Sequence, residues 1–438
     1  MSLAALSLAA LVLALVVSCV SPINIGVLAI VLAWVVGVYF GGMRVEQVLA
    51  GFPVPLFLTL AGVTLMFAQA QGNGTLDRVA QRAVRMCRGI AGVIPMMFFV
   101  MTAALSSSGP GNIAATALMA PLGMAAAGRY GIPPFLMAMM IAMGASAGSV
   151  SPIAPTGIIV NQLVAKMGLP DARWTIYANN LLAHALVGFS GYLLLGGARL
   201  LGSASTRMPA YAAASAGRLA GMTVATDAGP MTPAATGSEP FDWRHRFTLV
   251  MIAALIVGAV AFNLNVGMGA FAGALLLTLT RAADERAAFK SMPWNVIVMV
   301  TGVTTLVALL EKTGGMELFT TFLSNLSTPA TVTAVTAFFT GAVSIYSSTT
   351  GVVLPAFLPI APRLVEHIGG STAMAVVSSM VVGGHLVDVS PLSTLGALCL
   401  AAAPAGSDTR RLFNQLLAWG LSMTIVAALV CWVMFGLL

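Results

Sequence analysis

The sequence has few charged residues: Asp, Glu, Lys and Arg together make up 8% of its 438 residues, whereas 59% are hydrophobic. This shortage excludes a soluble fold, because such a chain would have to bury nearly all of itself in one core. Apolar runs of about 18 residues or more, the length that crosses a bilayer, recur along almost the whole sequence. We therefore expect an all-α polytopic membrane protein embedded in the lipid bilayer.

Signals of metal binding and of catalysis are scarce as well. The four cysteines, Cys19, Cys87, Cys399 and Cys431, share no metal-ligand spacing, which favours packing roles. There is no His-Glu-x-x-His motif and no pair of intramembrane aspartates, so we expect no enzyme and no cofactor. The net charge of +7 comes from arginines that cluster in loops, where they report topology and indicate no nucleic-acid partner. The only metal we expect is Na⁺, as one of two candidate coupling ions.

The chain divides into two halves of similar plan around one long hydrophilic stretch. In the first half, residues 1–202, we expect scaffold spans within 3–71, a hairpin over 90–128, a broken helix over 133–168 and a last span over 175–200. Residues 203–246, rich in Ala, Ser, Thr, Gly and Pro, are expected to form a cytoplasmic linker. In the second half, residues 247–438, we expect spans within 247–310, a hairpin over 330–368, a broken helix over 371–403 and a last span over 412–437.

Four short motifs recur in the same order in both halves. They are Gly62-Val63-Thr64 with Gly302-Val303-Thr304, Gln71-Gly72-Asn73-Gly74 with Glu311-Lys312-Thr313-Gly314, Pro121 with Pro355, and Ser151-Pro152-Ile153 plus Gly157 with Ser390-Pro391-Leu392 plus Gly396. Each half is expected to have about five transmembrane helices, a re-entrant hairpin and a broken helix. Because five is odd, the sequence predicts that the two copies are inverted repeats.

The basic residues agree with this topology. Arg78, Arg82, Arg85 and Arg88 recur at spacings of three and four, which places them on one face of a helix lying in the membrane interface. If this helix is cytoplasmic, 15 of the 20 Lys and Arg residues fall on that side and five fall outside. The five are Arg44, Lys166, Arg173, Lys312 and Arg363. We expect a multi-pass protein of the bacterial inner (cytoplasmic) membrane with both termini in the periplasm.

Small residues and proline interrupt the apolar segments at corresponding places in the two halves. The first hairpin turns at Ser106–Asn112, and the long crossings break at Ser151-Pro152 and Ser390-Pro391. Such interruptions are tolerated at bilayer depth only where open backbone lines a protein cavity, and paired interruptions indicate the binding site of a secondary transporter. A serine followed by proline is a helix-start signal, so we expect a helix to restart at each break.

We expect Asn112 to cap the second arm of the first hairpin, and Ser347 or Ser348 that of the second. Four helix N-termini would then converge near the membrane midplane, each with free N–H groups and about half a positive charge. A carboxylate could be held there without a buried lysine or arginine. The facing helix C-termini offer carbonyl oxygens suited to a hard cation. Expected substrate-binding residues are Ser108, Gly111, Asn112, Pro155, Thr156, Tyr346, Ser347, Ser348, Thr349, Ser393 and Thr394.

The only acid deep in an apolar crossing is Asp388, with His385 three residues earlier on the same helix face. An intramembrane ionisable pair is a functional hypothesis by default. It could take up a coupling proton, complete a cation site, or simply lock the break. His184 stands alone on an apolar helix and is interpreted as a core histidine. The residues expected around the coupling ion, Na⁺ or H⁺, are Ser106, Gly148, Ser149, Ser151, His385, Asp388 and Ser390.

The sequence VALLEKTGG, Val307–Gly315, lies within a span that leads into a second interfacial helix. In this segment and over nearly the whole chain, the protein resembles the ion-transporter superfamily that includes the divalent anion:sodium symporters, and most closely its MatC-type malonate/dicarboxylate carriers. The symporters carry Ser-Asn-Thr about ten residues before a hairpin proline, where this chain has Gly111-Asn112-Ile113 and Ile345-Tyr346-Ser347. Their Thr-Pro motif after the break corresponds to Ser-Pro here. The resemblance implies a homodimer, a scaffold domain that holds the dimer interface, and a transport domain that moves as an elevator.

We therefore expect a secondary active transporter of a small dicarboxylate, such as malonate or a C4 acid, coupled to Na⁺ or H⁺. Two alternatives stay open. A Na⁺/H⁺ antiporter or oxyanion exporter of the same superfamily would be expected to place more acids in the breaks than Asp388 alone. The membrane subunit of a binding-protein-dependent transporter would require a soluble periplasmic partner.

Overall fold

The computed structural model describes residues 2–21, 23–86, 92–202, 241–262, 264–404 and 406–437. Nearly all of the expected linker lies outside these residues. The described chain is helical and contains no strand, and six of its helices are long and apolar enough to cross a membrane. The expectation of an all-α polytopic membrane protein is confirmed.

The first half follows a regular order of helices. It begins with α1 (Leu3–Val20), α2 (Ile25–Trp34) continued by η1 (Val35–Phe40), the short α3 (Val45–Leu49), α4 (Val54–Gly72) and the arginine-bearing α5 (Thr75–Met86). It continues with α6 (Ile94–Ser107), α7 (Gly111–Tyr130), α8 (Pro134–Gly148), α9 (Pro155–Lys166) and α10 (Arg173–Tyr192), which runs on through η2 (Leu193–Gly197) into α11 (Ala198–Gly202).

The second half has the same order. It begins with α13 (Trp243–Ala261), α14 (Val266–Leu279), the short α15 (Glu285–Ser291), α16 (Trp294–Thr313) and α17 (Gly315–Asn325). The helical pair that follows consists of α18 (Val332–Ser344) and an arm made of η3 (Thr349–Val353), α19 (Leu354–Phe357), η4 (Leu358–Ile360) and α20 (Ala361–Ile368). The chain ends with α21 (Ala373–Leu386), η5 (Val387–Val389), α22 (Thr394–Ala401), α23 (Thr409–Cys431) and η6 (Trp432–Gly436).

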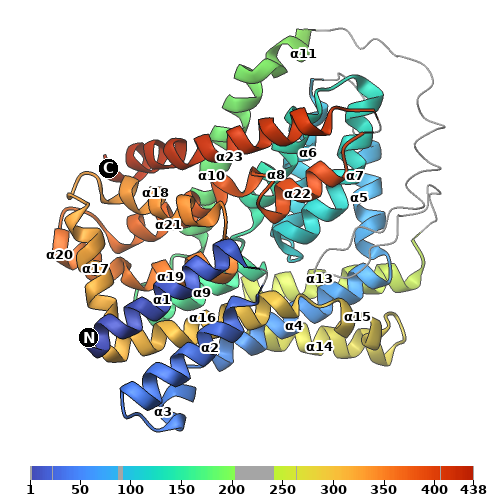
Figure 1. Ribbon diagram of the computed structural model, residues 1–438. Helices are drawn as coiled ribbons and strands as arrows, with labels where there is room; N and C mark the ends of the chain where they lie inside the picture. Colours follow the sequence, from blue (N-terminus) through green and yellow to red (C-terminus); the bar gives the residue numbers. More distant parts are fainter. Residues whose placement is uncertain are drawn as a thin grey trace.

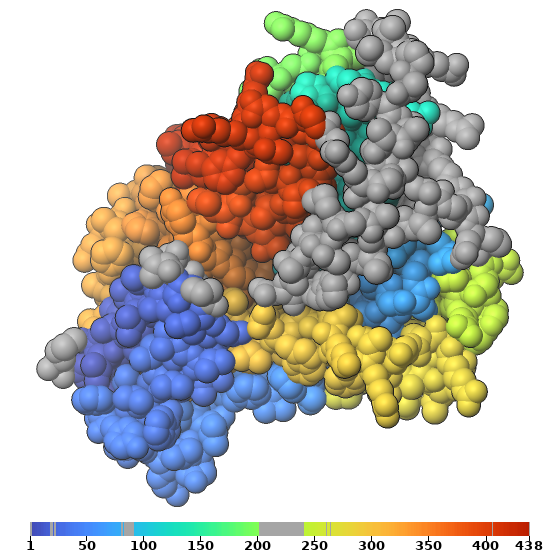
Figure 2. All heavy atoms as spheres, turned by 45° about the vertical axis from the view of Figure 1, so that its right-hand side comes forward, coloured from blue at the N-terminus to red at the C-terminus, as the bar shows by residue number. Residues whose placement is uncertain are grey.

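The helices form two groups (Figure 1). In one group α2 packs on α16, α4 packs on α14, and α4 also contacts α16. In the other, the paired arms α6–α7 and α18–α20 pack against the interrupted helices α8–α9 and α21–α22, with α10 and α23 on the outside. Figure 2 shows the blue N-terminal helices beside the yellow α14–α16 region, with the red C-terminal helices above them. The groups meet where α9 packs on α4, where η3 and α19 pack on α16, and where α20 packs on α17.

Glycine brings the helices of the first group close together at two equivalent crossings. A β-carbon on Gly302 of α16 would overlap the backbone of Gly26 on α2, and one on Gly62 of α4 would overlap the Gly267 carbonyl on α14. Only glycine allows backbones to approach this closely. The repeated Gly-Val-Thr motif therefore marks one glycine of each crossing pair.

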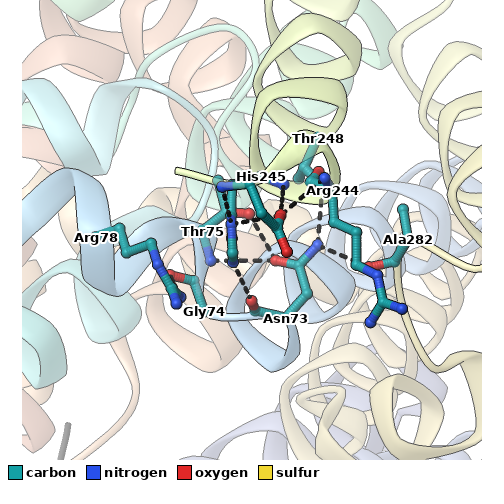
Figure 3. A network of polar contacts seen from close by, with 9 residues as sticks. Asn73, Gly74, Thr75, Arg78, Arg244, His245, Thr248 and Ala282 are labelled. Atoms are coloured by element: carbon teal, nitrogen blue, oxygen red, sulfur yellow. Dashed lines mark hydrogen bonds and ion pairs between the residues drawn. The ribbon is translucent and has the colours of Figure 1, made fainter. Parts of the chain in front are cut away.

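A polar contact also recurs at the end of each of these helices. Asn73, after α4, donates through its amide to the Thr248 hydroxyl on α13 at 2.8 Å and to the Ala282 carbonyl at 3.2 Å (Figure 3). Thr313, at the end of α16, shares a 2.7 Å hydroxyl bond with Ser7 on α1. The repeated four-residue motif that follows each Gly-Val-Thr therefore fixes the first helix of the opposite half.

Candidate functional site

The tip of the first helical pair is a turn of three residues, Ser108–Pro110, between α6 and α7. The expected capping role of Asn112 is wrong, because Pro110 is in the capping position and α7 begins at Gly111, two residues before the expected start. Proline has its φ preset for the helix and starts it without a side-chain cap. Asn112 therefore lies in the first turn of α7, where it is mostly buried and its side-chain oxygen accepts the Ile113 N–H at 3.0 Å.

Hydroxyl groups tie this tip to the first interrupted helix. The Ser106 hydroxyl donates to the Ala145 carbonyl at 2.8 Å, and the Ser107 hydroxyl lies 3.4 Å from the Gly148 carbonyl. The Ser108 hydroxyl turns back to the Leu105 carbonyl of its own helix. The Ser106 and Ser107 hydroxyls thus reach carbonyls at the end of α8, where the helix has stopped and its last acceptors lack an intrahelical partner.

The two breaks have the same path, and both differ from the expected one. Ser151-Pro152 and Ser390-Pro391 do not start the second helices, which begin at Pro155 and at Thr394. Each serine instead closes a turn, since its carbonyl accepts the N–H of Ala154 at 2.9 Å or of Ser393 at 3.0 Å. A proline after serine suits such a turn as well as a helix start.

Glycine is required six residues after each serine. A β-carbon on Gly157 would overlap the Ser151 carbonyl oxygen, and one on Gly396 would overlap the Ser390 carbonyl oxygen. The repeated Ser-Pro and glycine motif is thus the signature of one folded-back turn, used twice.

Asp388 is the centre of a hydroxyl cluster in the second break. Its carboxylate is 6% exposed and accepts hydrogen bonds from the Thr349 hydroxyl at 2.9 Å and the Ser393 hydroxyl at 3.4 Å. Thr349 is the first residue of η3, in the second helical pair, and also bonds to Ser344. A buried carboxylate surrounded by hydroxyl and carbonyl oxygens has the donor set that a hard cation or a proton needs.

His385 does not pair with Asp388, so that expectation is wrong. Its Nδ1 lies 2.8 Å from the Val381 carbonyl, and its ring faces His184 with 6.5 Å between centroids. The His184 Nδ1 lies 2.8 Å from the Asn180 carbonyl. Both imidazoles are fully buried, and neither Nε2 has a hydrogen-bond partner within the described residues. His184 is therefore a core histidine, as expected, and His385 is another.

The tip of the second helical pair, residues 345–348, lies between α18 and η3. One of the two caps expected there is confirmed. The Ser348 side chain accepts the Gly351 N–H at 3.0 Å and so caps η3. Tyr346 is about half exposed, and Ser347 lies between Tyr346 and the capping residue Ser348. Ser390 is buried and its hydroxyl accepts the Leu392 N–H at 3.3 Å, within the turn.

Tips and breaks of the two halves meet. The Thr156 hydroxyl, in the first turn of α9, bonds to the Thr350 hydroxyl of the second tip at 3.0 Å. Gly111, the first residue of α7, lies against the Pro155 ring, and α22 packs on α7. Ser149 stays apart, since its hydroxyl bonds only to the Ser146 carbonyl one turn back. The start of α7 therefore lies beside the start of α9, and α9 meets η3 at the Thr156–Thr350 contact. Ser393, directly before α22, and Thr349 of η3 both bond to Asp388.

A cavity of about 370 Å³ opens beside the first tip. Two expected site residues, Ser108 and Ser151, line it, but sequence reasoning missed the rest of its polar wall, formed by Ser107, Asp171, Arg173 and Tyr177. Its other wall is apolar and comes mainly from α13 and the start of α14. The sequence indicates Arg173 only as one of the five basic residues expected on the outer side of the membrane.

Two serine motifs familiar from hydrolases lie in ordinary helix here. Gly144–Gly148 has the Gly-x-Ser-x-Gly pattern but lies inside α8, and Gly188–Gly191 has the Gly-x-Ser-Gly pattern but lies inside α10. A hydrolase nucleophile of the first kind needs a strand-to-helix turn that exposes the serine. The Ser146 hydroxyl is buried, so the pattern carries no catalytic geometry.

Comparison with known proteins identifies the class. Residues 1–149 match the family model described as the N-terminus of the dicarboxylate carrier protein MatC. Over these residues the resemblance to MatC-type carriers is confirmed. Among solved structures, the YdaH transporter of Alcanivorax borkumensis, described as having an unusual topology, matches with a TM-score of 0.54 at 13% identity. The match covers 91% of this chain and 88% of that one, and at this identity it shows a shared fold. No curated protein sequence matches the chain. The protein is a multi-pass transport protein.

Proposed function

We propose that the protein is a secondary active transporter that carries a small dicarboxylate, malonate or a C4 acid, together with Na⁺ or H⁺. The observation that carries the proposal is the meeting of tips and breaks at the Thr156–Thr350 contact, beside the buried carboxylate of Asp388. Helix N-termini favour an anion through their free N–H groups. The oxygen-lined Asp388 cluster would hold the co-transported cation, which offsets part of the substrate's charge.

The substrate would contact both tips and both restarted helices. In this proposal its binding residues are those expected from the sequence, with Asn112 acting from the first turn of α7 and Thr394 from the first turn of α22. Thr349 donates a hydrogen bond to Asp388 and would thereby connect the second tip to the coupling ion. The remaining hydroxyls of the breaks orient the turns.

We propose that the two halves are inverted repeats and that the second group of helices moves against the first as an elevator. The reciprocal contacts support this arrangement, because α2 with α16 and α4 with α14 exchange places between the halves. The polar contacts Asn73–Thr248 and Thr313–Ser7 are exchanged in the same way. We further propose a homodimer, as the resemblance implies, in the bacterial inner membrane with periplasmic termini, as the distribution of basic residues predicts.

The test is uptake by purified protein in liposomes. Labelled malonate, succinate and citrate are offered under an imposed Na⁺ gradient, an imposed H⁺ gradient, or neither. We expect uptake of malonate or succinate that one of the two gradients drives. Gradient-driven Na⁺/H⁺ exchange without uptake of any diacid would replace the proposal with an antiporter. Uptake that appears only when a soluble periplasmic binding protein is added would replace it with a binding-protein-dependent system.

A further inference from the structure

The cavity beside the first tip contains an ion pair with the geometry of a bound carboxylate. The Arg173 Nε lies 2.9 Å from Asp171 Oδ1, and one of its terminal nitrogens lies 2.6 Å from Oδ2. Both carboxylate oxygens thus face the guanidinium edge, the two-pronged arrangement that arginine also offers to a substrate carboxylate. Hydrogen bonding from Arg173 lowers the pKa of the Asp171 carboxyl below its ordinary value, so Asp171 stays ionised at neutral pH.

The same cavity leads from this pair to the first tip. Arg173 and Tyr177 are four residues apart on α10 and share a helix face. The Tyr177 hydroxyl bonds to the Ser107 hydroxyl at 2.9 Å. Ser108 and the turn of the first break also line the cavity. A ligand held at Arg173 would therefore lie beside the segment where the proposed substrate site begins.

Size and chemistry favour a diacid over a bulkier anion. A volume of about 370 Å³ accommodates a three- or four-carbon diacid with several waters. One wall supplies a guanidinium and hydroxyl groups, whereas the other is apolar and suits a short carbon chain. Both partners of the ion pair are partly exposed, with relative side-chain exposures of 39% for Arg173 and 61% for Asp171, so exchange of one carboxylate for another needs no buried charge to move.

We propose that this cavity is a receiving site for the diacid, in which the guanidinium of Arg173 releases Asp171 and binds one substrate carboxylate. Asp171 then acts as a built-in competitor, which weakens binding and lets the substrate move on toward the tip. This inference rests on the proposed function, since it takes a dicarboxylate as the substrate.

Asp171→Asn gives the sharpest test. Besides pairing with Arg173, Asp171 accepts the Arg173 backbone N–H at 3.2 Å, next to the start of α10. Asparagine keeps that acceptor but loses the charge that occupies the guanidinium. We expect the KM for malonate to fall about threefold or more in Asp171→Asn and to rise about tenfold or more in Arg173→Gln. Arg173→Lys should lie between the wild type and Arg173→Gln.

Arg363→Gln is the matched control. Arg363 also pairs with an acid, Glu317, has a side-chain exposure of 40%, and is expected on the same side of the membrane, but it does not line the cavity. The KM of Arg363→Gln for malonate should equal that of the wild type.

A second control compares malonate with its half-amide. The wild type should prefer the diacid, and Arg173→Gln should lose most of that preference.

The outcomes separate the two proposals. If the wild type takes up no diacid, the proposed function and this inference both fail. If the wild type transports malonate but Asp171→Asn and Arg173→Gln keep its KM and its preference for the diacid, only the receiving site is overturned. Should Arg173→Gln not be recovered folded, the direction of the KM change in Asp171→Asn decides, because a merely structural ion pair gives no gain in affinity.

Discussion

The two break turns share a backbone path and differ in chemistry. Both close on a serine carbonyl and both need glycine six residues later. In the second turn Asp388 gathers hydroxyls from Thr349 and Ser393, whereas at the matching position of the first turn Ser149 only bonds back to its own helix. The repeat therefore preserves the fold of the turn, while the ionisable group of the site is found in one half.

The largest effect should come from the shared part of the two turns. Gly157→Ala and Gly396→Ala each place a methyl group onto a backbone carbonyl that cannot move freely. We expect a loss of about 3 kcal/mol or more of folding free energy, and no transport, from either change. Thermal unfolding in detergent and uptake in liposomes measure both. Gly72→Ala, where nothing lies within 4 Å, is the control and should change the stability by less than about 1 kcal/mol. Equal stability in all three variants would show that the turns do not need glycine.

The second-largest effect is expected from a change that affects only the second break turn. Thr349→Val keeps the shape of the side chain but removes the hydroxyl that donates to Asp388. Leaving a buried carboxylate short of a donor costs about 1–3 kcal/mol, so we expect uptake to fall about tenfold. Thr336→Val removes a buried hydroxyl that bonds only within α18 and should have little effect. If both variants lower uptake by the same small amount, Thr349 is not part of the site.

A smaller effect is expected at the first tip. Asn112→Ala removes an amide from the first turn of α7, where the proposed substrate lies. We expect the KM to rise about three- to tenfold, as for the loss of one polar contact, with no loss of folded protein. Asn414→Ala, on the exposed face of α23, is the control. Transport kinetics like those of the wild type in Asn112→Ala would remove this tip from the site.

The smallest effect should be at the counterpart of Asp388. Ser149→Ala removes a hydroxyl that bonds only to the Ser146 carbonyl. Because this bond competes weakly with the helix itself, we expect uptake to change by less than about twofold. A loss as large as that of Thr349→Val would mean that both turns bind the coupling ion.

Much of this arrangement could be predicted from the sequence. Interrupted apolar runs located the tips and breaks within a few residues, because clusters of glycine, serine and proline end a helix. The expected helix starts, Pro152 and Pro391, precede the actual ones by three residues, since Ser-Pro fits a turn and a helix start equally well. At the first break a second proline, Pro155, has the actual N-terminal position.

Contacts between distant residues could not be predicted. Tyr177 bonds to Ser107, 70 residues away, and Thr156 to Thr350, 194 residues away. Thr156 is an expected site residue, but nothing in the sequence indicates its partner Thr350 or singles out Tyr177. Arg173 was visible only as a charge outside the membrane, because its cavity is formed by helices of both halves. His385 was paired with Asp388 by helical spacing, yet its ring turns toward His184.

The most direct test of the account compares gradient-driven uptake with exchange in Asp388→Asn. Liposomes preloaded with unlabelled malonate report exchange of labelled malonate without any gradient, and empty liposomes report uptake driven by Na⁺ or H⁺. If Asp388 couples the cation to the substrate, the variant should keep exchange and lose the stimulation by the gradient. Stimulation by the gradient equal to that of the wild type would contradict the assignment of coupling to the second break.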